Sequence, residues 1–201
     1  GTIAARGALG VDRLPERRQV RVEVDVDTTM SMLPLIEDGS IRDVVDLLTG
    51  VAAVIGRREE LHVNLIGRDV TAVHIGELRG AAAAAQKALD SAGLGIGFRS
   101  ATVDRSRYIE PTLVLTVTDG VPADHAAAVA GVRRRPIVLQ VGGAAAEIEQ
   151  MGSVERRRTS VVPAAGHALA GRGWLDDPQE LFRTVKSLVS GLPTTESEGA
   201  L

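Results

Sequence analysis

The chain of 201 residues contains no cysteine. This absence excludes disulfide bonds, zinc sites built on thiolates and a cysteine nucleophile, and it is typical of a reducing compartment, so we expect a cytoplasmic protein. No apolar run approaches the roughly 20 residues that a transmembrane helix requires, and we expect no membrane span. The chain starts at Gly1 without a signal-like apolar segment, and we expect it to be part of a longer protein.

Aromatic residues are also scarce. With so few aromatic rings the core must be filled by Val, Leu, Ile and Ala, and a platform for stacking nucleic-acid bases is not expected. The net charge of −3 also argues against a nucleic-acid partner, because binding to phosphate backbones depends on clustered Lys and Arg. Two short basic runs, 133–135 and 156–158, are typical of solvated loops or helix ends. The aromatic residues are Phe98, Tyr108, Trp174 and Phe182.

The composition is that of a folded domain. Hydrophobic residues make up 44% and charged residues 24%, which is ordinary for a globular protein. A length of 201 residues suits one domain better than two. We therefore predict an N-terminal arm or short helix over 1–17, one domain over 18–192 and a flexible tail over 193–201.

Strands and helices alternate along the chain. Valines at every second position of 20–26 predict a strand with one apolar face, whose other face carries Arg21, Glu23 and Asp25. Apolar residues at helical spacing predict a helix over 41–55, with Ser40 as its N-cap after Gly39. Further strands are predicted at 61–66, 70–75, 113–117, 137–141 and 159–163, and further helices at 77–92, 123–132 and 181–189.

This alternation predicts an α/β fold with a doubly wound, mostly parallel sheet, helices on both faces and right-handed crossovers. The strands at 61–66 and 70–75 are the exception. Only Gly67, Arg68 and Asp69 separate them, which is too short for a parallel crossover, so they are predicted to form an antiparallel hairpin.

Acidic residues end two of the predicted strands. Asp27 follows the first strand and Asp119 follows the strand at 113–117, so both carboxylates are expected at the edge where parallel sheets bind ligands. Thr29 and Ser31 add hydroxyl oxygens. Oxygen ligands of this kind suit Mg²⁺, or another divalent cation such as Ca²⁺ or Mn²⁺. A coordination position left open would accept a carboxylate from a protein partner.

Simpler interpretations stay open at each position. Asp119 and Gly120 are typical of a turn that ends a strand, and 28–31 fits a polar loop whose hydroxyls bond nearby backbone. The four histidines show no pair at helical metal spacing and predict no zinc site. The glycines of 93–97 lack the complete dinucleotide-binding pattern and are interpreted as a loop.

The segment Asp27-Thr28-Thr29-Met30-Ser31 resembles the D-x-S-x-S metal-ion-dependent adhesion site of von Willebrand factor A domains, with Thr in place of the first Ser. Thr118-Asp119-Gly120 is similar to the second motif of that family. The stretches 31–41 and 175–182 resemble its TerF-like, tellurite-resistance branch, and the resemblance spans roughly 14–192.

The resemblance implies a six-stranded sheet with an antiparallel strand at its edge. It also implies one more metal ligand, a Thr after paired glycines; Thr102 is the nearest match, Ser100 competes with it, and the glycine pair is missing. The expected metal ligands are thus Asp27, Thr29, Ser31, Thr102 and Asp119. The implied function is a non-enzymatic interaction module that captures an acidic group of a protein partner, in a bacterial stress response.

Two alternatives remain. Asp25-Val26-Asp27-Thr28-Thr29 also fits the D-x-D-x-T loop of haloacid-dehalogenase-like phosphatases, in which Asp25 would be the nucleophile and Asp27 the acid-base group. That chemistry needs a well-placed lysine, and neither Lys87 nor Lys186 has a recognisable context for it. The other alternative is a scaffold of the same fold that has lost its metal. The oligomeric state and the partner are not predicted.

Overall fold

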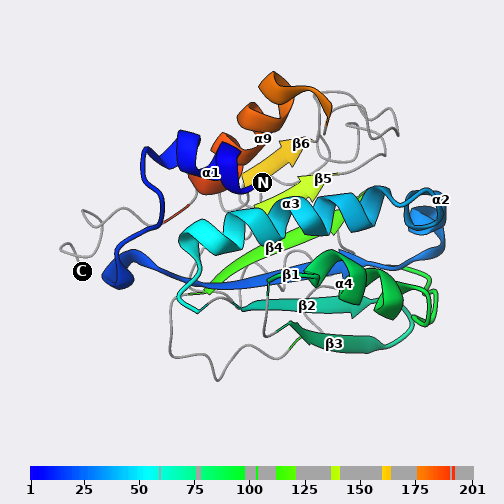
Figure 1. Cartoon of the computed structure of the whole chain (residues 1–201). Coiled ribbons are helices and arrows are strands. Elements are labelled where there is room, and N and C mark those ends of the chain that lie inside the picture. The colour runs from blue at the N-terminus through cyan, green and yellow to red at the C-terminus, as the bar shows by residue number, and fades with distance from the viewer. Residues whose placement is uncertain are drawn as a thin grey trace, which may run out of the picture.

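The computed structural model of the chain (Figure 1) shows a layer of helices on a twisted sheet. Several predicted features lie outside the described residues: the helix at 123–132, the tail from 193, Ser100 and Thr102. The structure describes residues 1–58, 60–75, 78–97, 103, 112–120, 137–140, 160–163, 176–190 and 192.

The sheet has six strands in the order β3-β2-β1-β4-β5-β6. All neighbouring strands run parallel except β3, which is antiparallel to β2 and forms one edge of the sheet. The predicted α/β class is therefore confirmed. The strands are β1 (Arg21–Asp27), β2 (Leu61–Ile66), β3 (Val70–Ile75), β4 (Thr112–Thr118), β5 (Ile137–Gln140) and β6 (Ser160–Pro163).

The β2–β3 hairpin begins and ends at the residues that the sequence pattern predicts. Its register pairs Ile66 with Val70 next to the turn and Leu61 with Ile75 at the open end. Because side chains on paired strands alternate between faces, this register also decides which polar residues of the hairpin meet.

The longer described helices pack side by side on one face of the sheet (Figure 1): α4 against α3, α3 against α1, and α1 against α9. The helix predicted at 123–132 lies outside the described residues, so helices on the other face stay a prediction. No helix in the described part of the chain is long and apolar enough to cross a membrane. The helices are α1 (Thr2–Leu9), α2 (Leu33–Glu37), α3 (Ser40–Ile55), α4 (Ala81–Leu89) and α9 (Pro178–Ser190), with short 3-10 turns at Glu16–Arg18 and Met30–Met32.

Two helix starts differ from the prediction. Ser40 is not the capping residue of α3: its main-chain N–H donates to Asp38 Oδ1 at 2.8 Å, and its hydroxyl has no hydrogen-bond partner among the described residues. Gly39 occupies the N-cap position, and the side chain of Asp38 before it accepts the N–H of the first helical residue. Helix α4 begins at Ala81 rather than at 77, because Gly80 adopts φ 85°, a left-handed conformation that is not helical.

The N-terminal segment is helical and belongs to the core. Ala5 of α1 is fully buried, and a Cβ atom placed on Gly50 of α3 would lie 2.4 Å from the main-chain nitrogen of Thr2. The glycine therefore allows the backbones of α1 and α3 to touch.

The polar face of β1 is buried. Glu23 is 1% exposed and forms an ion pair of 2.9 Å with Arg21, while Asp25 is fully buried and accepts a hydrogen bond of 2.9 Å from the Asn64 amide of β2. The charges that the sequence places on this central strand are thus accommodated by polar partners, as burial of charged groups requires. This polar face leads directly to Asp27 at the end of the strand.

Candidate metal centre

The predicted site lies where β1 and β4 end side by side. These two strands are neighbours in the sheet, and their register pairs Val26 with Val117, so Asp27 is level with Thr118. Asp119 is the next residue of the chain and is half-buried. The fold therefore brings the two predicted acids to one edge, although 91 positions separate Asp27 from Thr118 in the sequence.

The Asp27 carboxylate is buried and hydrogen-bonded at both oxygens. Its Oδ1 accepts the main-chain N–H of Thr29 at 2.8 Å, and its Oδ2 accepts the Thr118 hydroxyl at 2.7 Å. The Thr118 oxygen accepts in turn from the main-chain N–H of Gly120 at 3.1 Å. This network fixes the orientation of the carboxylate relative to both strand ends.

Burial at 2% exposure raises the pKa of Asp27, because a charged carboxylate is poorly solvated there. Hydrogen bonds from Thr29 and Thr118 lower this pKa, but less than burial raises it, and the neighbouring Asp119 carboxylate adds repulsion. Two acids held close together at the edge of a sheet form an environment that a divalent cation would neutralise.

Two hydroxyl groups stand beside this carboxylate. Thr29 Oγ1 and Ser31 Oγ are 3.1 Å apart, with Thr29 buried and Ser31 exposed. Adjacent ligands of an octahedral Mg²⁺ with bonds of about 2.1 Å lie roughly 3 Å apart. The spacing of the two hydroxyls therefore suits neighbouring positions in such a shell, and all the donors are oxygen atoms, as this cation prefers.

Main-chain hydrogen bonds hold the loop that carries these hydroxyls. The N–H of Thr28 donates to Ile66 O of β2 at 2.9 Å. The loop after α4 contributes Gly95, whose N–H donates to Thr28 O and whose carbonyl accepts from Met30 N–H, each at 3.1 Å. Residues 28–30 are thus fixed between the end of β2 and this second loop.

Glycines make this three-way contact possible. A Cβ atom on Gly95 would lie 2.3 Å from the carbonyl carbon of Gly67, and one on Gly67 would lie 2.4 Å from Thr28 Oγ1. The atoms that a side chain at Gly95 would meet belong to the main chain, so no side-chain rotation could relieve the clash. The glycines that the sequence pattern marked only as loop and turn residues therefore position the candidate ligands.

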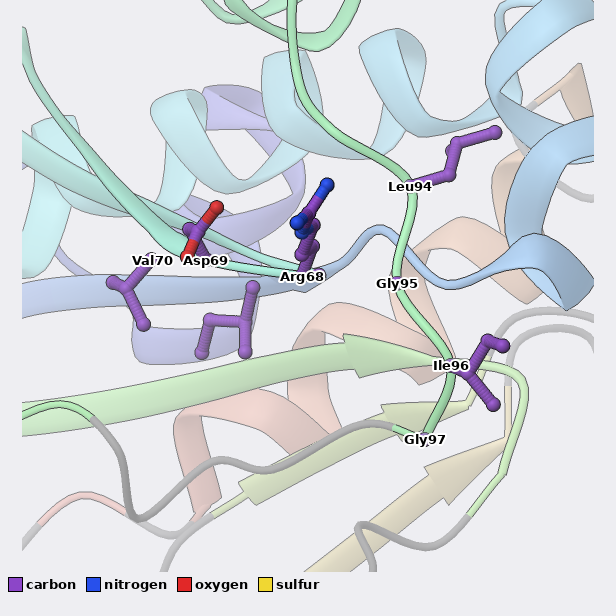
Figure 2. Close-up of a pocket in the computed structure, with 9 residues that line it drawn as sticks. Arg68, Asp69, Val70, Leu94, Gly95, Ile96 and Gly97 are labelled. Atoms are coloured by element: carbon purple, nitrogen blue, oxygen red, sulfur yellow. The ribbon is translucent and has the colours of Figure 1, made fainter.

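A pocket opens beside this junction (Figure 2), between the β2–β3 turn and the loop after α4. In this view Leu94 and Ile96 project from the same side of the loop, away from Arg68. Ile96 is 97% exposed. Met30 is also exposed and belongs to residues 28–31, which carry the candidate hydroxyl ligands and are called the metal loop below. The pocket is lined by Ile66, Gly67, Arg68, Asp69, Val70, Leu94, Gly95, Ile96 and Gly97.

Four of the predicted ligands thus come to one edge of the sheet: Asp27, Thr29, Ser31 and Asp119. Thr102 and its competitor Ser100 lie outside the described residues. The sequence marks Thr118 only as part of a motif, yet its hydroxyl donates a hydrogen bond to Asp27 directly. A hydroxyl at the last position of a strand that neighbours an acid-ending strand is the signal that could have identified it.

No protein-family model and no curated protein matches the chain. Among solved structures it is similar to "von Willebrand factor type A from Catenulispora acidiphila", with a TM-score of 0.53 and 16% sequence identity. The similarity covers 85% of this chain but only 43% of that protein, so the chain spans less than half the length of its structural neighbour. At this identity the likeness establishes a shared fold, the von Willebrand factor A fold.

Proposed function

We propose that the chain is a protein-interaction module of the von Willebrand factor A type that uses a divalent cation to bind an acidic group of a partner. The observation that carries this proposal is the Asp27 carboxylate, held at the sheet edge by Thr118, with the Thr29 and Ser31 hydroxyls 3.1 Å apart beside it. Mg²⁺ is the expected cation, and Mn²⁺ or Ca²⁺ would suit the same oxygen ligands.

The open coordination positions explain how a partner could bind. Asp27 and Asp119 together neutralise a cation of charge +2, and the remaining coordination positions are open to water or to a further oxygen ligand. A carboxylate from the partner is a suitable ligand for such a position, because hard divalent cations bind carboxylate oxygens in place of water. The metal would then form part of the interface.

The surroundings of the site favour a partner whose acidic residue is flanked by apolar side chains. Met30, Leu94 and Ile96 are exposed hydrophobic residues on the two loops that meet at Gly95. The adjoining pocket is lined by both Arg68 and Asp69, so it carries one positive and one negative charge. Apolar anchors next to a specific polar contact are a common arrangement of protein interfaces.

A bacterial stress-response role, of the tellurite-resistance kind, rests on the resemblance of 31–41 and 175–182 to the TerF-like branch, and a cytoplasmic location rests on the absence of cysteine. Both belong to this proposal. Shared fold alone does not establish either, since one fold serves many functions.

The phosphatase alternative has less support from the described residues. Its nucleophile would be Asp25, which is fully buried within β1 and accepts a hydrogen bond from Asn64. A nucleophile must reach the phosphorus atom of its substrate. Hydrolysis of a generic phosphate ester that depends on Mg²⁺ and is lost in Asp25→Asn would favour this alternative over the interaction module.

Isothermal titration with MgCl₂ tests the proposal. The wild-type chain is expected to bind about one Mg²⁺, and Asp27→Ala is expected to abolish the binding. Asp12→Ala is the matched control, because the Asp12 side chain is 92% exposed and belongs to the segment after α1 rather than to either strand end. No binding heat with Mg²⁺, Mn²⁺ or Ca²⁺ in wild type would support the metal-free scaffold instead.

A further inference from the structure

The open end of the β2–β3 hairpin carries a second group of metal-binding side chains. The register pairs His62 of β2 with His74 of β3, so the two rings lie on the same face of the sheet. Their centroids are 4.8 Å apart and their Nδ1 atoms are 3.3 Å apart. Glu60, just before β2, places Oε2 3.7 Å from His62 Nε2.

These three side chains can converge on one ion. Each offers one ligand atom, and these atoms all lie within 4.8 Å of one another. Zinc bonds to nitrogen and oxygen are about 2.0–2.2 Å long, which places neighbouring ligands of a tetrahedral ion roughly 3.4 Å apart. His74 is exposed and the side chains of His62 and Glu60 are partly exposed, so small rotations would bring the three atoms to that spacing.

The local charge also favours a cation. Arg21 lies near His62, but it forms an ion pair of 2.9 Å with the buried Glu23, which is the cross-strand neighbour of His62 on β1. With Glu60 included and both imidazoles neutral, these groups carry a net charge of −1. A neutral pair of imidazoles has lone pairs available for a metal, since only one nitrogen of each ring carries hydrogen.

We propose that Glu60, His62 and His74 bind Zn²⁺, or a similar transition-metal ion, at the edge of the sheet. Two imidazoles and a carboxylate suit zinc rather than magnesium. The ion would join the first residues of β2 to the last residues of β3, and its remaining position would be open to water. Because β3 is an edge strand that pairs with β2 in the described sheet, the ion would add a second link between this edge strand and the rest of the sheet.

This site is separate from the one at Asp27. Asp27 is level with Ile66 in β2, whereas His62 is level with Glu23. Four residues of strand, about 13 Å, lie between the two levels. The zinc proposal therefore stands whether or not Mg²⁺ binds at the other end of the strand.

Competition of the protein with a chromophoric chelator for Zn²⁺ measures the affinity, and Co²⁺ substitution reports the geometry through its visible absorption. The exposed position of His74 makes His74→Gln the main variant, with Glu60→Gln as the second. Each is expected to weaken Zn²⁺ binding by at least about 10- to 100-fold, because even residues that only support metal ligands contribute that much. The tetrahedral Co²⁺ spectrum should disappear as well.

Two controls make the result decisive. His125→Gln removes a histidine of the same chemistry elsewhere in the sequence, and Asp27→Ala removes the main carboxylate of the proposed Mg²⁺ site. Both are expected to bind Zn²⁺ like wild type. Unchanged Zn²⁺ affinity in both His74→Gln and Glu60→Gln would overturn the proposal. Loss of Zn²⁺ binding in either control variant, His125→Gln or Asp27→Ala, would also overturn it.

Discussion

At the scale of single residues, Asp27 has two roles that conflict. It is a buried carboxylate with raised pKa, which costs stability in the metal-free protein, and it is the central ligand of the cation site that we propose. Such a conflict between stability and the chemistry of a site is typical of functional positions. Two substitutions separate the stability cost of the buried charge from the stabilisation that the hydrogen bonds to Asp27 provide.

Asp27→Asn is expected to stabilise the metal-free protein at neutral pH. Burial raises the pKa of Asp27 above its unfolded value of about 3.9, so the folded state retains the proton more strongly than the unfolded chain. The stability contributed by that proton is complete below the unfolded pKa and is lost as pH rises through the folded pKa. Asn cannot ionise, so its advantage should appear between pH 4 and 7.

Urea unfolding in EDTA at pH 4 and at pH 7 measures this difference. Excess Mg²⁺ should raise the unfolding free energy of wild type and leave that of Asp27→Asn unchanged. If Asp27→Asn lowers the unfolding free energy at pH 7 by the same amount as at pH 4, the charge of Asp27 carries no such cost.

Thr118→Val is expected to destabilise the fold by about 1.5–3 kcal/mol, the usual contribution of a hydrogen bond to a charged group. The change keeps the shape but removes the donor to Asp27 Oδ2 and the acceptor of Gly120 N–H. Thr49→Val is the matched control, since this buried threonine of α3 donates only to the helix carbonyl of Val45. Equal losses in the two variants, measured by urea unfolding, would contradict the role given to Thr118.

At the scale of elements, the metal loop depends on the contact between two other loops. Gly95 →Ala is expected to separate the loop after α4 from residues 28–30, because the added Cβ would lie 2.3 Å from Gly67 C and 2.6 Å from Arg68 N. We expect a cost of about 1–3 kcal/mol, as for overpacking, together with weaker Mg²⁺ binding.

Gly93→Ala provides the control from the same loop. A Cβ at Gly93 meets only Arg68 Cβ, at 4.0 Å, so this variant should keep wild-type stability and Mg²⁺ affinity. Thermal unfolding and Mg²⁺ titration of the two variants test the contact. Similar behaviour of both would show that the close approach at Gly95 does not position the metal loop.

The elements themselves were largely predictable from the sequence. Alternating apolar residues and a three-residue turn suffice to define the β2–β3 hairpin, and its register follows from the turn. That register already pairs His62 with His74, but a search for histidines at helical spacing cannot detect ligands that meet across strands. The start of α3, with Gly39 rather than Ser40 at the N-cap and Asp38 accepting the first N–H, depends on local backbone geometry that composition does not specify.

At the scale of the whole molecule, the site depends on strand order. The sequence places acids at the ends of two strands, but only the order β2-β1-β4 makes those ends neighbours. The sequence predicted both acids at one edge of the sheet but did not specify the strand order, and the contact of Thr118 with Asp27 is a consequence of the observed order. The Gly67–Gly95 contact joins segments 28 positions apart and could not be inferred from either segment alone.

The central claim, that a divalent cation binds at the ends of β1 and β4, is tested most directly by nuclear magnetic resonance with substoichiometric Mn²⁺. Paramagnetic broadening should be strongest at the amides of residues 28–31, 119 and 120, and excess Mg²⁺ should reverse it. One equivalent of Zn²⁺ added first is expected to keep Mn²⁺ from His62 and His74, the other proposed metal site. Broadening that is absent from residues 28–31 and 119–120, or that Mg²⁺ does not reverse, would contradict the claim.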